Sequence, residues 1–334
     1  MSVTNISLNL DLNKQQTIDI FLQPTITDEG LLNTFRIISN LHAGKMNIGL
    51  MEQLDKITRK AQHCNPQYPG KFSLSERTIE VKYAQGGLEW CYEELVNTHY
   101  DYLAPLYSTM GNKQIQRQLL DLIYTQLSIA ARRDMERVAW FGDSNSTDAD
   151  YNWADGIWTR MDEVILDGTI GNVVDTLSGT DITGAQAYNF LRDVVREAPA
   201  ELRQIDANAK RIYISGNMWL KILDYLEDNA INNGMIQVFN EPDAGIAATY
   251  RGIPIMVQDR WDQIQAADFG QDDANYILYT PLNNLVLATD MTAGASASTY
   301  LRQYLEPRTR VLYVDYSYVI DTNFVFPQLI SLGK

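Results

Sequence analysis

The stretch Ala130-Ala-Arg-Arg-Asp-Met-Glu-Arg-Val-Ala-Trp-Phe-Gly-Asp143 decides the fold, because it brings a long amphipathic helix to a Gly-Asp turn. Between residues 113 and 141, apolar residues recur at steps of three and four, which predicts one buried helix face. They are Ile115, Leu119, Leu122, Ile123, Leu127, Ala130, Met135 and Val138. Gly142 follows, where a glycine commonly ends a helix. At ~1.5 Å per residue the helix is roughly 40 Å long, about the width of a domain.

A strand precedes this helix. In residues 77–84, Ile79, Val81 and Tyr83 alternate with polar residues. This period of two is typical of a half-buried strand, so the three side chains are expected on one face.

The chain before this strand has little core of its own. Residues 1 to about 50 form an arm with a short helix that starts near Thr27 and carries Leu31, Leu32, Phe35, Ile38 and Leu41. Such an arm becomes ordered only against the rest of the chain or a neighbouring subunit. Residues 63–71, His-Cys-Asn-Pro-Gln-Tyr-Pro-Gly-Lys, are dense in Pro and Gly and predict the tip of a projecting hairpin or loop.

The chain beyond the long helix alternates helices and strands from about 175 to 300, which predicts a compact α/β subdomain. Thr183-Gly-Ala-Gln186 fits a capping box, and an apolar stripe follows it, ended by Pro199. The stripe consists of Ala187, Phe190, Leu191, Val194, Val195 and Ala198. Strands are expected at residues 211–215, 253–257, 276–279, 285–288 and 309–326.

Composition and charge narrow the function classes. The 334 residues are 45% hydrophobic, enough for one large core or two smaller ones. No run of ~18 apolar residues suggests a membrane span, no secretion signal is evident, and two cysteines make no disulfide framework, so a cytoplasmic protein is expected. The net charge of −15 argues against direct binding to nucleic-acid phosphates, although an acidic shell is compatible with enclosing DNA.

Motifs for catalysis are missing from the sequence. It contains neither a phosphate-binding loop nor a dinucleotide fingerprint. Ser215 is the nearest approach to a hydrolase serine and is better explained as the N-cap of the next helix. His63, Cys64, Cys91 and His99 allow a zinc or thiolate–imidazole site in principle, but their spacing fits no known pattern.

The loop after the long helix resembles a calcium loop in part. Asp143, Asn145, Asp148 and Asp150 supply oxygen atoms, but Asp148 occupies the position of the expected glycine and Ala154 that of the final acid. Weak calcium binding by this loop is an alternative, but the sequence predicts no dedicated metal site and no cofactor. The 19 tyrosines and six tryptophans suit protein–protein contact surfaces as well as a large core.

The order of these parts resembles the major capsid proteins of tailed bacteriophages with the Hong Kong 97 fold. The resemblance covers roughly residues 50–330. It rests on Thr78-Ile-Glu-Val81, Glu93-Glu-Leu95, the helix end quoted above and Tyr250-Arg-Gly-Ile-Pro-Ile255, in fixed order. It implies an α+β fold with an N-terminal arm (1–54), an E-loop hairpin (55–88), a P-domain with the long helix and a long sheet (89–174 and 301–334), and a compact A-domain (175–300).

The resemblance also implies a function without catalysis. Subunits would form pentamers and hexamers of an icosahedral phage head around double-stranded DNA, assembled in the host cytoplasm. A separate scaffolding protein, a portal and decoration proteins are the implied partners. An encapsulin-type compartment, which shares the fold, is the alternative, and a soluble α/β enzyme that uses Cys91 and His99 is a second rival.

Two sets of residues are expected to contact neighbouring subunits. The E-loop set is Pro66, Tyr68, Pro69, Lys71 and Phe72. The arm set is Leu31, Leu32, Phe35 and Ile38.

Overall fold

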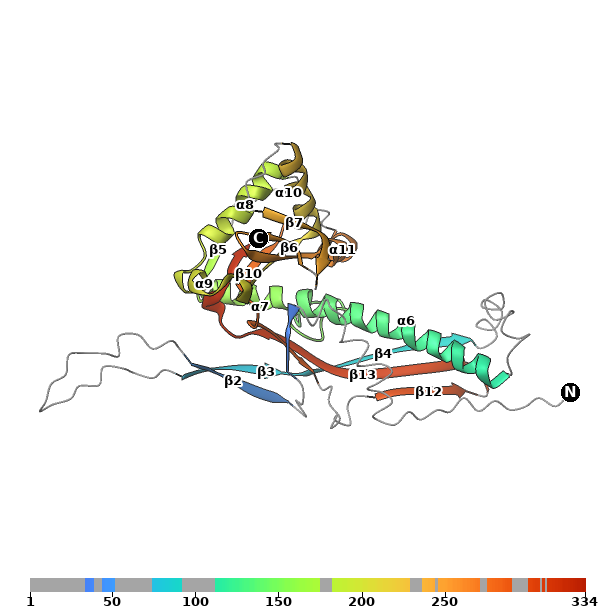
Figure 1. Ribbon diagram of the computed structural model, residues 1–334. Coiled ribbons are helices and arrows are strands. Elements are labelled where there is room, and N and C mark those ends of the chain that lie inside the picture. Colours follow the sequence, from blue (N-terminus) through green and yellow to red (C-terminus); the bar gives the residue numbers. More distant parts are fainter. Residues whose placement is uncertain are drawn as a thin grey trace, which may run out of the picture.

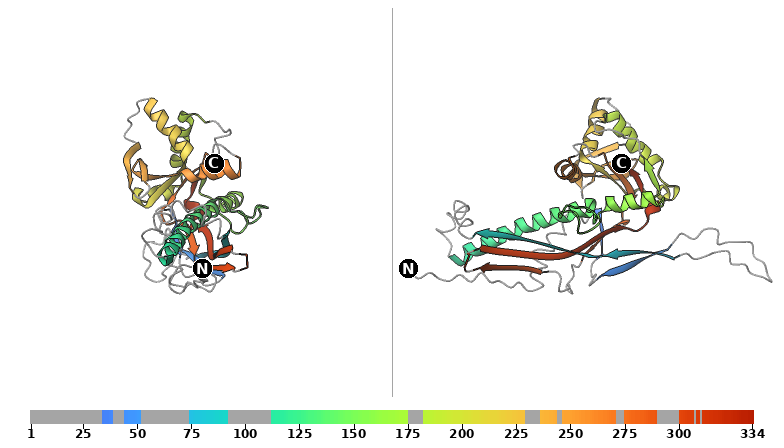
Figure 2. Two further views of the ribbon diagram at one scale, coloured as in Figure 1. Left: turned by 90° about the vertical axis from the view of Figure 1, so that its right-hand side faces the viewer. Right: turned by 180° about the vertical axis from the view of Figure 1, so that it is seen from behind.

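A computed structural model describes residues 34–38, 44–51, 74–91, 112–174, 182–228, 236–243, 246–270, 275–289, 300–306, 308–309 and 311–334. They form a long layer and a compact unit that stands over one end of it (Figure 1). Views from the side and from behind show the same two parts (Figure 2). Among the described residues, no helix combines the length and the apolar character needed to cross a membrane.

The long layer is built on a five-stranded sheet with β13 at its centre. Its strands are β1 (Arg36–Ile38), β4 (Lys82–Cys91), β11 (Leu285–Thr289), β12 (Tyr300–Glu306) and β13 (Val311–Phe324). β13 pairs antiparallel with β4 along one edge and with β12 and then β11 along the other. Only β1 is parallel to its neighbour, β11.

The predicted long helix is confirmed as α6 (Asn112–Phe141), which lies along the sheet (Figure 1). Alternate side chains of β13, such as Leu312 and Val314, share a core with Leu127 and Met135 of the helix. Ala130 was expected on the buried face but is exposed, and Ala131 is fully buried in its place. The buried residues Leu127, Ala131 and Met135 follow one another at steps of four, whereas the prediction used a step of three from Leu127 to Ala130. The buried face therefore continues through Ala131.

The predicted strand over residues 77–84 is two strands that meet at Val81. β3 (Leu74–Glu80) ends before it and β4 begins after it, while the Val81 N–H donates to Gly44 O at 3.1 Å. This break shifts the alternation by one residue. Ile79 and Val81 are buried as expected, but Tyr83 is 66% exposed and Ala84 is buried instead.

The compact unit is built on a seven-stranded sheet of order β5-β14-β10-β6-β9-β8-β7. Its strands are β5 (Asn172–Val174), β6 (Lys210–Ser215), β7 (Ile236–Asp243), β8 (Ile246–Tyr250), β9 (Ile253–Gln258), β10 (Ile277–Pro281) and β14 (Ser331–Gly333). Its helices are α8 (Gly184–Arg196), α9 (Ala200–Gln204), α10 (Gly216–Asp228) and α11 (Asp259–Asp268), with 3-10 turns at Ala207–Ala209 and Pro327–Leu329. α7 (Ile157–Leu166) connects α6 to this unit.

The capping box at the start of α8 is confirmed. The Thr183 hydroxyl accepts from the Gln186 N–H, and the Gln186 side chain accepts from the Thr183 N–H at 2.8 Å. The predicted apolar stripe, from Ala187 to Ala198, is buried in the core of the compact unit. Ser215 is fully buried just before α10, yet its hydroxyl makes no hydrogen bond, so it does not cap that helix through its side chain. Asp262 of α11 accepts from the Asn217 N–H instead, at 2.9 Å.

Two expectations about the chain's division differ in the structure. β11 lies within the expected A-domain range but belongs to the long sheet. β5 and β14 lie within the expected P-domain ranges but belong to the sheet of the compact unit, where β14 pairs with β5 and β10. The short arm helix was expected to continue to Leu41, but in its described part only Thr34 is helical, and Arg36–Ile38 is strand β1. The backbone of β1 pairs with β11, and this pairing outweighs the local helical pattern of the sequence.

Candidate assembly surfaces

A two-stranded ribbon projects from the long layer (Figure 1). β2 (Lys45–Met51) pairs antiparallel with β3, from Lys45 opposite Glu80 to Met51 opposite Leu74. Residues 52–73, which connect the two strands, lie outside the described residues. The expected E-loop range began at 55 and ended at 88, but residues 82–88 are part of β4 in the long sheet.

Polar side chains run along the ribbon and pair across it. Asn47 Nδ2 donates to Glu76 at 2.9 Å, and its Oδ1 accepts from the Thr78 hydroxyl at 3.0 Å. Lys45 and Lys82 both contact Glu80, at 2.9 and 3.3 Å, and lower the pKa of its carboxyl group. The contacts between opposite side chains of β2 and β3 favour the observed register of the two strands. The apolar side chain of Met46 in β2 is 40% exposed.

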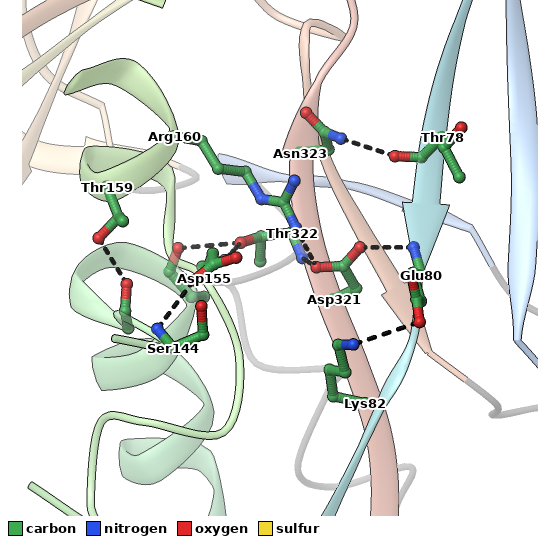
Figure 3. Close-up of polar contacts among 12 residues, drawn as sticks. Thr78, Glu80, Lys82, Ser144, Asp155, Thr159, Arg160, Asp321, Thr322 and Asn323 are labelled. Atoms are coloured by element: carbon green, nitrogen blue, oxygen red, sulfur yellow. Dashed lines mark hydrogen bonds and ion pairs between the residues drawn. The ribbon is translucent and has the colours of Figure 1, made fainter. Parts of the chain in front are cut away.

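A buried carboxylate fixes the root of the ribbon (Figure 3). Asp321 of β13 is 1% exposed. One of its oxygens accepts from the Glu80 N–H at 2.9 Å, and the other accepts from Arg160 of α7 at 2.7 Å. The ribbon, the long sheet and the helix that leads into the compact unit therefore meet at one side chain.

The burial of Asp321 has an electrostatic consequence. Removal from water raises the pKa of this carboxyl group above its ordinary 3.8, and Arg160 and the backbone donors only partly oppose that rise. Two further contacts hold the same root: Asn323 Nδ2 donates to Thr78 O at 3.1 Å, and the Arg77 guanidinium lies 4.7 Å from the centre of the Phe324 ring.

The end of α6 is held by a close approach of two glycines. The Gly156 N–H donates to Gly142 O at 2.8 Å. A Cβ atom on Gly142 would lie 2.2 Å from Ala154 O, and one on Gly156 would lie 2.6 Å from Gly142 N. Gly142 is not in the left-handed region, so glycine is required here for space and not for its backbone conformation.

The acidic loop between these glycines uses its carboxylates internally. Asp143 Oδ1 accepts from the Asn145 N–H at 2.9 Å, and Asp148 Oδ1 accepts from the Asp150 N–H at 3.0 Å. Asp155 accepts from the Ser144 N–H at 2.8 Å (Figure 3). Within the described part of the chain, no three His, Cys, Asp or Glu side chains are grouped so that they could hold a metal ion.

Comparison with known proteins identifies the architecture. No protein-family model matches the sequence, and no curated protein matches it. Among solved structures, a chain of the satellite phage P4 procapsid is similar over 96% of this chain and 99% of that one, with a TM-score of 0.56 and 12% identity. The cyanophage A-1(L) capsid is similar over 99% and 96%, with a TM-score of 0.55 and 10% identity.

The chain has the fold of these capsid proteins. A virus-like particle from Pyrococcus furiosus is also similar, over 96% of this chain and 98% of that one, with a TM-score of 0.50 and 11% identity. The similarity spans nearly the full length of each chain, so it includes both the long layer and the compact unit.

Most residues that the sequence analysis assigned to subunit contacts lie outside the described part of this capsid fold. These are Pro66, Tyr68, Pro69, Lys71 and Phe72 of the loop and Leu31 and Leu32 of the arm. His63, Cys64 and His99 lie outside it as well. Ile38 is in β1 and half-buried beside Ile79 and Val81.

Phe35 requires a correction. Its side chain is 3% exposed, and its ring centre lies 5.1 Å from that of Trp140 within the same chain. This leaves almost none of the ring for a neighbouring subunit. The apolar character of Phe35 was recognised from the sequence, but its partner, 105 positions along the chain, was not.

Proposed function

We propose that the protein is a major capsid protein that assembles into pentamers and hexamers of an icosahedral phage head enclosing double-stranded DNA. One observation carries this proposal: the similarity to the phage P4 procapsid chain extends over 96% of this chain and 99% of that one. In this function the protein is structural, without catalysis or cofactor, and it resides in the capsid of the virion after assembly in the host cytoplasm.

The layout of the parts follows from that function. We assign the ribbon β2–β3 and the residues between its strands to the E-loop, the long sheet with α6 to the P-domain, and the seven-stranded sheet with its helices to the A-domain. The N-terminal arm precedes the ribbon. Compared with the expectation from sequence, β11 moves to the P-domain, while β5 and β14 move to the A-domain.

Contacts between subunits are proposed at the projecting parts. Rings of identical subunits need two different surfaces that fit each other, and extensions tie neighbouring rings together. We place Pro66, Tyr68, Pro69, Lys71 and Phe72 in contact with an adjacent subunit, and Leu31, Leu32 and Ile38 in contact with another. Many modest contacts, closed into a shell, hold far more tightly than any pair.

Other partners belong to the same proposal. The P4 particle is a procapsid that includes a size determination protein. A further assembly protein is in keeping with our proposal of a separate scaffolding protein, a portal and decoration proteins. The net charge of −15 would keep DNA from adhering to the inner wall and requires no sequence-specific binding.

An encapsulin-type compartment is the second candidate, favoured by the similarity to the Pyrococcus furiosus particle. Such a shell would assemble without a portal or scaffold around an enzyme that carries a docking peptide. Its contents therefore distinguish it from a phage head.

The deciding experiment has two parts. The protein is expressed alone and imaged by negative-stain electron microscopy, where capsomers or closed shells are expected and a monomer would contradict both candidates. Native particles are then treated with nuclease and analysed for protected double-stranded DNA. Protected DNA supports the phage head, whereas particles that hold an enzyme and no DNA support the compartment.

A further inference from the structure

An aromatic cluster forms the joint between the long layer and the compact unit. Trp140, in the last turn of α6, lies 4.7 Å from Trp261 of α11 and 6.1 Å from Tyr213 of β6, measured between ring centres. Trp158 of α7 lies 5.2 Å from Trp261. Rings from the helix of the long layer and from the sheet and helix of the compact unit thus share one core.

Residues 34–38 cross this joint. Thr34 and Phe35 are 2% and 3% exposed, and the Phe35 ring packs 5.1 Å from Trp140. The Tyr213 hydroxyl of the compact unit donates to Thr34 O at 3.2 Å. The next three residues form β1 and pair with β11 of the long sheet, so five consecutive residues contact both parts.

The attachment of this segment is short. β1 is three residues long and stands at the end of the sheet order, so few backbone hydrogen bonds hold it. The segment's side chains and one hydrogen bond supply the rest of the attachment: Thr34 and Phe35 are buried, Ile37 and Ile38 pack against neighbouring cores, and Tyr213 donates to Thr34 O. A short element at the edge of a sheet can leave its site without unfolding either sheet.

With Phe35 packed in the joint, two buried polar groups of the aromatic cluster have no hydrogen-bond partner. The indole N–H groups of Trp158 and Trp261 are buried in the cluster and make no hydrogen bond. Buried donors without acceptors carry a free-energy cost, so this part of the core is not fully optimised for stability. Two polar contacts elsewhere in the joint do not involve the Phe35 ring: Arg260 with Glu136 at 2.5 Å, and Tyr151 with Asp268.

We propose that residues 34–38 act as a detachable clip that sets the orientation of the compact unit on the long sheet. With Phe35 seated, the two parts move as one body. With Phe35 withdrawn, the joint keeps its polar contacts but gains freedom to hinge. The segment that precedes Thr34 is covalently continuous with the clip, so a second copy of the chain that binds this segment would act on the joint directly. The contacts of the clip lie within one subunit, so its test does not require the proposed shell.

The test measures the orientation of the two parts. Spin labels are attached at Leu220→Cys on α10 and Tyr83→Cys on β4, which are 58% and 66% exposed, after Cys64 and Cys91 are replaced by serine. Labelled subunits are diluted with unlabelled ones so that only distances within a subunit are recorded by pulsed electron paramagnetic resonance. We expect one narrow distance distribution for this reference and at least a twofold broadening in the Phe35→Ala variant.

Two further variants make the result decisive. Tyr213→Phe keeps the ring and removes only the hydroxyl that reaches Thr34, and we expect an intermediate broadening. Phe190→Ala removes a ring of the same size from the core of the compact unit, where Phe190 is 2% exposed, and is expected to leave the distribution narrow. The proposal would be overturned if the distance distribution were unchanged in both Phe35→Ala and Tyr213→Phe. It would also be overturned if Phe190→Ala broadened the distribution as much as Phe35→Ala does. If Phe35→Ala does not fold, Tyr213→Phe decides the question.

Discussion

Gly142 and Gly156 bring two backbone segments closer together than any side chain allows. We predict that Gly142→Ala and Gly156→Ala each lower the free energy of unfolding by about 1 to 3 kcal/mol, because the added methyl group overpacks the contact. Chemical denaturation of the unassembled subunit measures this loss. Asn152→Ala, an exposed change in the same loop, is the control and is expected to stay within about 0.5 kcal/mol of the unmodified protein. A similar cost in all three variants would contradict the explanation.

Arg160 is the charged partner of a carboxylate that is almost fully buried. The Arg160→Met change leaves Asp321 without its counter-charge, and we expect a loss of about 3 kcal/mol in the free energy of unfolding. The same change made in an Asp321→Asn background should cost much less. Equal costs in the two backgrounds, measured by urea denaturation, would mean that the ion pair does not stabilise the root of the ribbon.

The raised pKa of Asp321 predicts a dependence on pH. Because the carboxyl binds its proton more tightly in the folded state, its contribution to stability is full below its ordinary pKa of 3.8. That contribution is lost as the pH rises through the higher folded value. The free energy of unfolding of the unmodified protein, relative to Asp321→Asn, should therefore fall between acidic and neutral pH. A difference that grows in this interval would mean that Arg160 dominates burial and that the pKa is lowered.

The helix α8 depends on the hydroxyl at its start. We predict that Thr183→Ala costs about 1 kcal/mol of stability, because the Gln186 N–H loses its acceptor at the first turn. Thr183→Ser keeps the hydroxyl and should recover most of that loss. Thermal unfolding followed by circular dichroism compares the two. Equal losses in the two variants would point to the methyl group of Thr183 instead.

Elements with local signals were predictable from the sequence. The capping box and apolar stripe of α8 are encoded within 16 residues, and the long helix within 30. The break at Val81 was not predictable, because it depends on Gly44 and on the side chain of Asp321. The root of the ribbon was not predicted for the same reason. Asp321 accepts hydrogen bonds from Arg160 and Glu80, which precede it by 161 and 241 positions in the sequence. The only available signal was a charged residue in the apolar run Tyr318-Val-Ile-Asp321.

Assembly should depend on aromatic residues of the segment that connects β2 and β3. We predict that Tyr68→Ala with Phe72→Ala reduces the yield of assembled particles at least tenfold while the circular dichroism of the subunit is unchanged. Gln67→Ala, a polar position in the same stretch, is the control and should assemble normally. Particle yield is measured by sedimentation and negative-stain microscopy. Unimpaired assembly of the double variant would remove these residues from the proposed contacts.

At the scale of the whole molecule, the sequence predicted the order of the parts along the chain. It did not predict which strands pair in each sheet. A long helix followed by a compact α/β unit was confirmed. The exchange of β11 and β14 between the two sheets was not foreseen, because a strand of three residues such as Ser331–Gly333 carries no pattern of its own. Its place is decided by β5 and β10 on either side, more than 50 residues away in sequence.

That place has a consequence for biosynthesis. β14 lies between β5 and β10, so β5 has no partner within the described sheet until residue 333 has emerged from the ribosome. A nascent polypeptide therefore keeps an incomplete sheet, with an open slot between β5 and β10, until β14 has been synthesised. Products truncated before residue 331 would lack β14, so we expect them to carry the same gap and to be more sensitive to proteolysis.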